Sequence, residues 1–164
     1  MLRILKISSE SAALETVRLL FLEYAAELQE DLCFQSFDAE VRHPLQKYGP
    51  PNGVIFLAYW NEEAVGCIAL QPLSETGVCE MKRLYVQPGF RKYGIGRALA
   101  QQLIETSDLL GYSSMRLDTL ERLSPAITLY KQLGFEIINA YYENPLPGVV
   151  YMERKNEKFI QDAH

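Results

Sequence analysis

The chain has 164 residues, 48% of them hydrophobic and 23% charged, a balance typical of a globular protein with its own core. Its formal net charge of -5 argues against a general nucleic-acid binder, which needs a broad basic surface. The N-terminal segment is too short and too soon polar for a signal peptide, and no apolar run reaches membrane-spanning length. We therefore expect a single domain over residues 1–164 with no nucleic-acid or membrane partner.

The cysteines and histidines show no metal-ligand spacing. Cys33, Cys67 and Cys79 form no CxxC pair, and the two histidines lie far apart in the sequence. Three is an odd number for a disulfide framework, which favours a reducing compartment. We expect no metal site and a cytoplasmic location.

The N-terminal part predicts a strand followed by helices. Residues 2–7 are typical of a short strand. Between Ser11 and about Leu32, apolar residues recur at three- and four-residue steps, which predicts an amphipathic helix. Residues 37–48 predict a second, weaker helix that ends at a Gly/Pro cluster.

The middle of the chain has the composition of β-strands. Residues 53–60, 64–70 and 78–86 are rich in β-branched and aromatic side chains and predict a three-strand antiparallel meander. Residues 95–110 have helical spacing of apolar residues, and Gly111 is a suitable helix end.

The C-terminal part predicts a strand, a helix and a closing strand pair. Residues 114–120 form the strand, and Ser124 is the expected N-cap of the helix, which ends at a left-handed Gly134. Residues 135–142 and 148–155 are the closing pair. The order β-α-α-β-β-β-α-β-α-β-β indicates a mixed α/β domain.

A basic stretch with two close glycines lies between the meander and the next helix. The window from Lys82 to Arg97 holds five of the 16 Lys and Arg residues and no acid. Within it, an R-x-x-G-x-G pattern ends in Gly94 and Gly96. Glycines let a backbone approach a ligand closely, and amides at a helix start bind anions. The pattern favours equally a phosphate-binding loop and a plain strand-to-helix turn.

Two better-known glycine motifs do not fit this stretch. A Rossmann GxGxxG needs a small residue where Leu99 stands. It also follows the first strand of a βαβ unit, whereas strands predicted to be antiparallel precede this loop. A P-loop needs Lys and Ser/Thr where Ile95 and Gly96 stand.

The segment CEMKRLYVQPGFRKYGIGRALAQQLI, followed by MRLDTLERLSPAITLYKQLGFEII, resembles the GNAT superfamily of acetyl-CoA-dependent N-acetyltransferases. The likeness includes A-x-x-L-Y-x-x-x-G-F from Ala126 to Phe135 and covers roughly residues 78–138. It implies the GNAT fold, α/β (α+β), with a mixed, mostly antiparallel central sheet and helices on both faces. The sheet would splay between the strands at 78–86 and 114–120.

The resemblance also implies a coenzyme A site. Loop amides around residues 91–97 would cradle the pyrophosphate, and the backbone of residues 84–86 would pair with the pantetheine arm. Leu123 stands where many members carry Asn, and the neighbouring Ser124 is the candidate for that contact. The expected cofactor-binding residues are Leu84, Tyr85, Val86, Arg91, Lys92, Tyr93, Gly94, Ile95, Gly96, Arg97 and Ser124.

The implied reaction is direct attack of an amine on the acetyl thioester. An alkyl amine has a pKa near 10, so only about one molecule in a thousand is nucleophilic at pH 7 and a base is needed. Glu80 is the expected base, acting through water; it could instead bind a cationic substrate or pair with Lys82 or Arg83. Tyr130 matches the family's helix Tyr and is the expected acid for the coenzyme A thiolate, the alternative being a core aromatic.

The acceptor pocket would be built from the first helix pair and the last strand pair. Its candidate lining residues are Asp31, Phe34, Gln35, Arg83, Tyr141, Tyr142 and Asn144, although the last segment could be only a hairpin loop. We expect a small-molecule amine as acceptor. The alternatives are a protein or peptide amine as acceptor, or a non-catalytic acyl-CoA sensor. The sequence is also compatible with a homodimer.

Overall fold

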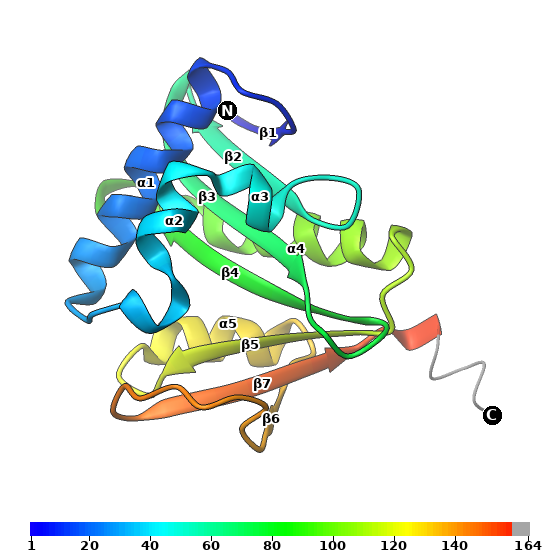
Figure 1. Ribbon diagram of the computed structural model, residues 1–164. Helices are drawn as coiled ribbons and strands as arrows, with labels where there is room; N and C mark the ends of the chain where they lie inside the picture. Colours follow the sequence, from blue (N-terminus) through cyan, green and yellow to red (C-terminus); the bar gives the residue numbers. More distant parts are fainter. Residues whose placement is uncertain (159–164) are drawn as a thin grey trace. The chain divides into compact units, whose positions relative to one another are not determined.

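The computed structural model of the protein describes residues 1–158 (Figure 1). The chain forms two compact units: the first is Met1–Gln71 with Met81–Leu103, and the second is Pro72–Glu80 with the chain from Ile104 onward. Within residues 1–158, no helix is both long and apolar enough to cross a membrane. One family domain over residues 1–164 stays a prediction.

The first unit consists of a sheet with helices on both of its faces. Its complete elements are β1 (Leu2–Ile7), α1 (Ala12–Leu28), η1 (Cys33–Gln35), α2 (Phe37–Arg42), α3 (Pro44–Tyr48), β2 (Val54–Trp60) and η2 (Pro88–Tyr93). It also holds most of β3 (Glu63–Pro72), β4 (Val78–Val86) and α4 (Ile95–Leu109), each of which extends into the second unit. β1 and β2 are antiparallel, as are β2 and β3. In Figure 1, α1, α2 and α3 lie in front of β2–β4, and α4 lies behind them.

Helix α1 forms where the apolar spacing predicts it but ends earlier than expected. The Ser11 hydroxyl accepts a hydrogen bond from the Leu14 amide (3.3 Å) and caps its start. Gln29 adopts a left-handed conformation (φ 57°) and ends the helix. The predicted end near Leu32 is therefore wrong: Leu32 is buried, but from a loop, and its apolar character imitates helical spacing.

The second predicted helix is two short helices. α2 ends at Arg42 and α3 begins at Pro44, with His43 between them at φ -136° and ψ 67°. A residue that precedes proline is pushed out of the helical region because the proline ring crowds its backbone. A single helix over residues 37–48 is thus excluded by Pro44.

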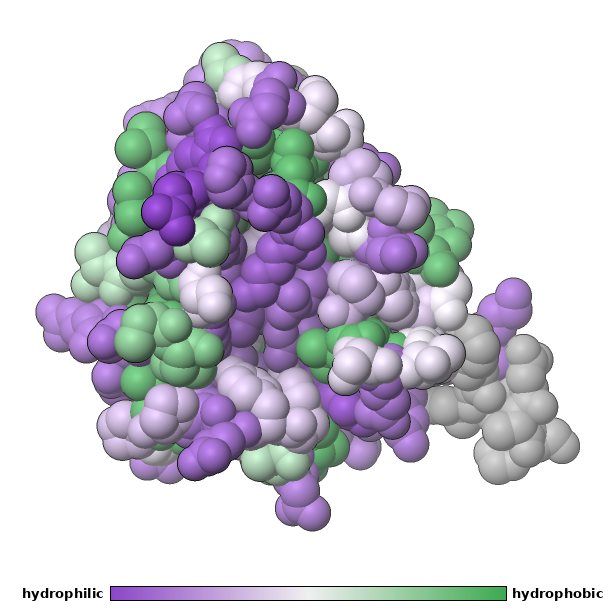
Figure 2. Space-filling model, viewed as in Figure 1, coloured by the Kyte–Doolittle hydropathy of each residue, from purple (hydrophilic) through white to green (hydrophobic). Residues whose placement is uncertain are grey.

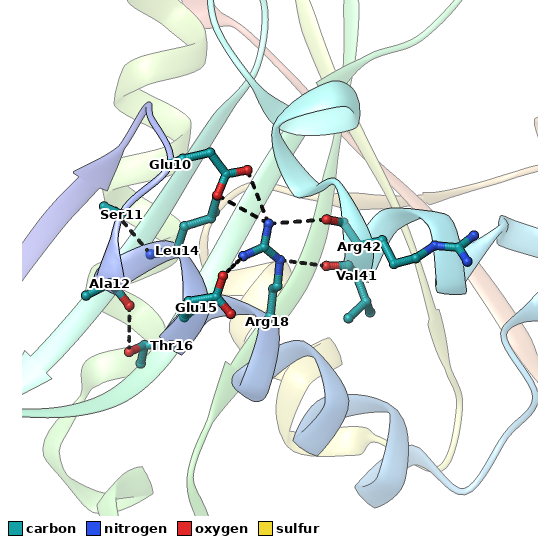
Figure 3. Close-up of polar contacts among 9 residues, drawn as sticks. All are labelled: Glu10, Ser11, Ala12, Leu14, Glu15, Thr16, Arg18, Val41 and Arg42. Carbon is teal, nitrogen blue, oxygen red and sulfur yellow. Dashed lines mark hydrogen bonds and ion pairs between the residues drawn. The ribbon is translucent and has the colours of Figure 1, made fainter.

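Arg18 fastens α1 to α2 (Figure 3). Its Nε donates to the Val41 carbonyl (3.0 Å) and its Nη2 to the Arg42 carbonyl (3.2 Å), which satisfies carbonyls at the end of α2. Glu10 and Glu15 bind the same guanidinium, but both are largely exposed, so these ion pairs contribute little.

The second unit holds the C-terminal elements. They are β5 (Ser114–Leu120), α5 (Ser124–Gln132), β6 (Glu136–Ile138) and β7 (Val149–Lys155), with β7 antiparallel to both β5 and β6. β6 is shorter than the predicted strand 135–142. The following loop has its own contacts, among them the Tyr151 hydroxyl donating to the Tyr142 carbonyl (2.8 Å).

Helix α5 begins one residue earlier than predicted. The Leu123 carbonyl accepts hydrogen bonds from the Ala126 and Ile127 amides, so Leu123 is the N-cap and Ser124 is the first helical residue. The Ser124 side chain is exposed and does not cap the helix, which corrects the expected role. At the other end, Gly134 has φ +98° and ends the helix as predicted.

Strand β4 contributes to both units. The seven strands hydrogen-bond in the order β1-β2-β3-β4-β5-β7-β6. β4 pairs with β5 in parallel over Val78–Glu80 only, and Arg83, further along β4, has a positive φ of 61°. A non-glycine residue in this region marks an irregularity such as a bulge. Pairing over Val78–Glu80 agrees with the expected splay of the sheet between the strands at 78–86 and 114–120.

The surface facing the viewer in Figure 2 is mixed. Among the described residues, hydrophobic side chains appear there as separate patches between hydrophilic ones. Such scattered apolar residues are ordinary on a water-facing protein surface.

Candidate functional site

The glycine loop lies at the start of α4, in the first unit. Gly94 is left-handed (φ +73°), and a Cβ built there or on Gly89 would meet nothing within 4 Å. A Cβ on Gly96 would only touch Val86 Cγ2, at an ordinary 3.8 Å. Packing therefore does not require glycine at position 96. The amides of a first helical turn have no acceptor within the helix, so this open turn fits an anionic group such as a pyrophosphate.

Arg91 connects this loop to the end of β4 and to α1. Its Nε donates to the Val86 carbonyl (2.8 Å), and its Nη2 binds Glu27 Oε2 (2.5 Å). Next to it, the Tyr85 hydroxyl and the Gln87 amide donate to Glu23 Oε1, at 3.2 and 3.1 Å. Burial and the Glu23 carboxylate raise the pKa of Tyr85 to about 12. Glu23 and Glu27, on one face of α1, thus bind the end of β4 and Arg91 of the glycine loop.

Glu80 is a buried acid in the second unit, with only 3% of its surface exposed. The Tyr141 hydroxyl donates to its Oε2 (2.5 Å), and Arg116 lies 5.3 Å from the centroid of the Tyr141 ring. Burial and the Glu80 carboxylate raise the pKa of Tyr141 well above its ordinary value. Tyr141 therefore keeps its proton and remains a donor to Glu80.

Tyr130 is the buried residue of α5. Its ring packs edge-on against Phe135, with centroids 5.8 Å apart, and its carbonyl accepts the Phe135 amide (3.0 Å). The left-handed Gly134 turns the chain between them. The aromatic contact fixes the orientation of the phenol, and it is compatible with both an acid and a core aromatic.

Residues 16–135 match the family described as Acetyltransferase (GNAT) family. The chain belongs to this family. It is 46% identical over 146 residues to an uncharacterized N-acetyltransferase of Schizosaccharomyces pombe, covering 88% of this chain and 90% of that protein. It is also 33% identical over 103 residues to the N-acetylaspartate synthetase of Danio rerio, covering 62% of this chain and 36% of that protein.

The fold of the acetyltransferase agrees with solved structures. An acyl-CoA N-acyltransferase structure from Klebsiella pneumoniae has a TM-score of 0.72 at 28% identity, covering 94% of this chain and 97% of that one. The GNAT identification and fold class from the sequence are confirmed. The protein is an acetyl-CoA-dependent N-acetyltransferase, and the glycine loop is open as a coenzyme A site requires.

Trp60 provides a fluorescence probe with which coenzyme A binding can be tested. It is the only tryptophan of the chain, and its ring stacks on Tyr93 of the loop, with centroids 4.5 Å apart and an angle of 14°. We expect coenzyme A to change Trp60 emission saturably because the ligand alters the environment of Tyr93. Tyr93→Ala should reduce the change. Binding seen by calorimetry with constant Trp60 emission would place the cofactor away from this loop.

The N-terminal acceptor candidates lie around η1. Asp31 is exposed, and its Oδ1 accepts the Cys33 amide (2.9 Å), which lowers the pKa of Asp31. Phe34 is half-buried within η1. Gln35 Oε1 accepts a hydrogen bond from Arg83 Nη2 (2.8 Å). The structure therefore brings Gln35 and Arg83 together.

Arg83 is bound to a buried acid that the sequence does not indicate. Its Nε donates to Glu40 Oε2 (2.7 Å) and its Nη2 to Glu40 Oε1 (2.9 Å), and both side chains are almost fully buried. Lys47 Nζ also binds Glu40 Oε1 (3.0 Å). A substrate group that bound Arg83, one of the expected pocket-lining residues, would compete with Glu40 for the guanidinium.

Acid is expected to weaken the first unit through Glu40. Burial alone would raise the pKa of Glu40, but the hydrogen bonds and charge of Arg83 and the charge of Lys47 outweigh it and hold the pKa below its ordinary 4.5. The resulting stability is present above the unfolded pKa and is lost as pH falls through the folded pKa. Between about pH 5 and 2, Tm should fall more in the wild type than in Glu40→Gln.

The exposed Glu10 supplies the control for this measurement, because Glu10→Gln should keep the wild-type dependence of Tm on pH. Parallel Tm curves for the wild type and Glu40→Gln would contradict the expected role of Glu40.

The C-terminal acceptor candidates form a second polar cluster. The Tyr142 hydroxyl and the Asn144 Nδ2 (2.7 Å) both donate to Asp118 Oδ2. The backbone N–H of Asn144 donates to the Tyr151 hydroxyl (3.2 Å). Asp118 was missed from the sequence, although alternation along β5 indicates it: Met115 and Leu117 are buried, which puts Asp118 on the opposite face.

Proposed function

We propose that the acetyltransferase modifies a primary amine of a small molecule, with Glu80 as a water-mediated base and Tyr130 as the general acid. The observation that supports this most is the buried Glu80 carboxylate with the Tyr141 hydroxyl on one oxygen. Burying a carboxylate costs free energy, and functional sites are among the places where such buried acids are retained.

Glu80 acts by accepting a proton from the substrate ammonium group through a water molecule, and the neutral amine that results attacks the acetyl thioester. A carboxylate has about four acceptor positions, and the Tyr141 hydrogen bond occupies one of them. Tyr141 keeps its own proton and therefore orients the carboxylate without competing for the proton that is moved.

Tyr130 acts by donating its hydroxyl proton to the departing thiolate. A phenol with an ordinary pKa near 10 is a competent donor to a thiolate whose conjugate acid is near 8.5. Packing on Phe135 restricts the ring, which favours one direction for the hydroxyl.

Acetyl-CoA supplies the activated acetyl thioester when it is bound. Its pyrophosphate would lie on the amides of residues 91–97, with Arg91, Lys92 and Arg97 adding positive charge. Residues 84–86 would pair with the pantetheine arm, and Ser124 is the candidate polar contact from α5. The open space at Gly94, and the absence of a packing need for glycine at position 96, support this assignment.

A small acceptor is supported by one of the relatives. The name of the Danio rerio protein states that it makes N-acetylaspartate, so its acceptor is a free amino acid; the aligned part is 62% of the present chain. The proposed lining residues are Asp31, Phe34, Gln35, Tyr141, Tyr142 and Asn144, and the buried Arg83 acts on this pocket through its hydrogen bond to Gln35. Three free cysteines in the described residues support a reducing, cytoplasmic setting.

The test is calorimetry with acetyl-CoA followed by a thiol-release assay. The amine library should hold free amino acids, polyamines, aminoglycosides and peptides. Thiol release with a small amine supports the proposal, and release with peptides alone would favour a protein acceptor. Tight binding without release on any amine would favour an acyl-CoA sensor. Light scattering of the same sample tests for a homodimer.

A further inference from the structure

We propose that the buried Glu40–Arg83 ion pair is a positioning device that holds the acceptor-side segment 29–36 against strand β4. Both members are nearly excluded from solvent, at 3% exposure each. Two hydrogen bonds of 2.7 and 2.9 Å join the guanidinium to the carboxylate. The proposal rests on the proposed function, since that function places the acceptor beside this segment.

Stability alone is a poor reason for such a pair. Moving two charges out of water costs about as much as their attraction returns, and apolar residues of similar size often do as well or better. The pair does provide direction, because a bidentate guanidinium–carboxylate contact fixes the relative orientation of its two partners.

Arg83 occupies a backbone position that needs such support. Its φ of 61° is unusual for a residue with a side chain, and such conformations persist only where the surroundings over-determine them. The guanidinium is enclosed by two rings, 5.4 Å from the Tyr24 centroid and 5.2 Å from the Phe37 centroid. These contacts and Glu40 fix the irregular point of β4 from the side of α1 and α2.

The same pair reaches the segment between α1 and α2. Arg83 Nη2 donates to Gln35 Oε1 (2.8 Å), and Lys47 Nζ connects Glu40 to the Gln35 carbonyl (3.5 Å). Segment 29–36 begins and ends with left-handed residues, Gln29 and Ser36, and only the single turn η1 lies between them. Little regular backbone hydrogen bonding stabilises it, so side-chain anchors such as Gln35–Arg83 determine its conformation.

The double variant Glu40→Leu/Arg83→Met separates positioning from stability. Apolar replacement of both charges should keep Tm within about 5 °C of the wild type, and the partly exposed Lys47 can turn to solvent. The dissociation constant of coenzyme A should stay unchanged. We expect the acceptor KM to rise at least about tenfold and amide exchange in residues 29–36 to become at least about tenfold faster. Arg83→Lys keeps the charge and should recover part of both effects.

Arg18→Met is the matched control, because the hydrogen bonds of Arg18 to the Val41 and Arg42 carbonyls join α1 to α2 (Figure 3). It should lower Tm while leaving the acceptor KM and the exchange of residues 29–36 as in the wild type. Wild-type acceptor KM and wild-type exchange in the double variant would overturn the proposal. The exchange measurement needs no acceptor, so it decides this question even if no small amine proves to be a substrate.

Discussion

Tyr130→Phe is expected to lower kcat by about two to three orders of magnitude while the acetyl-CoA dissociation constant stays the same. The change removes one hydroxyl and keeps the ring that packs on Phe135, so the fold should be unaffected. General acid catalysis is typically worth about 10²–10⁴-fold, and a leaving thiolate is stable enough to keep the loss in the lower part of that range. Steady-state thiol release gives kcat, and calorimetry gives the dissociation constant.

Tyr59→Phe is a suitable control for the loss of a phenolic hydroxyl. Tyr59 lies on β2, where its ring contacts Arg3, and it has no proposed part in catalysis. Wild-type kcat is expected there. If Tyr130→Phe also turned over at the wild-type rate, Tyr130 would be a core aromatic and no part of the mechanism.

Glu80→Gln is the second substitution with a large expected effect. The amide has nearly the same shape and can still accept the Tyr141 hydrogen bond, but it cannot take a proton. We expect kcat/KM to fall by about 100-fold or more and its acidic limb to disappear, because that limb reports the base of the free enzyme. The measurement is the pH dependence of kcat/KM for the best amine found in the library.

A carboxylate outside the site controls for the loss of one negative charge. Glu63 is exposed at the start of β3, so Glu63→Gln should keep both the rate and the acidic limb. An acidic limb that persists in Glu80→Gln would exclude Glu80 as the base. A normal kcat with a raised acceptor KM would instead make it a ligand for a cationic substrate.

The predictions that depended on local chemistry agree well with the structure. β4 has the predicted bounds, Val78–Val86, because β-branched and aromatic residues favour a strand through their local preferences, which can be recognised in the sequence. Gly134 is left-handed and ends α5, as predicted from the common pattern of a glycine just after a helix. The errors occurred at boundaries, at Leu32, Pro44 and Ser124, where burial in a loop or the choice of cap depends on neighbours distant in sequence.

The partners of the site residues needed the tertiary structure. The sequence offered Lys82 or Arg83 as an ion-pair partner for Glu80. The fold adds a hydrogen bond to Glu80 from the Tyr141 hydroxyl, 61 positions away, and joins Arg83 to Glu40. Glu40 had no sequence signal, since an acid in a short weak helix is ordinarily solvated. Its burial accompanies the contacts that α2 makes with Arg83, the irregular point of β4.

The amino-acid sequence by itself determined the family, the cofactor and the order of the elements. These follow from glycine conformational freedom, apolar spacing and the R-x-x-G-x-G and A-x-x-L-Y-x-x-x-G-F motifs, all of which act over a few residues. Only the tertiary structure decided which polar side chains meet, Glu40 with Arg83 and Glu80 with Tyr141. A side-chain pair joined across 40 or more positions leaves no local pattern, because its geometry exists only once the strands and helices have packed.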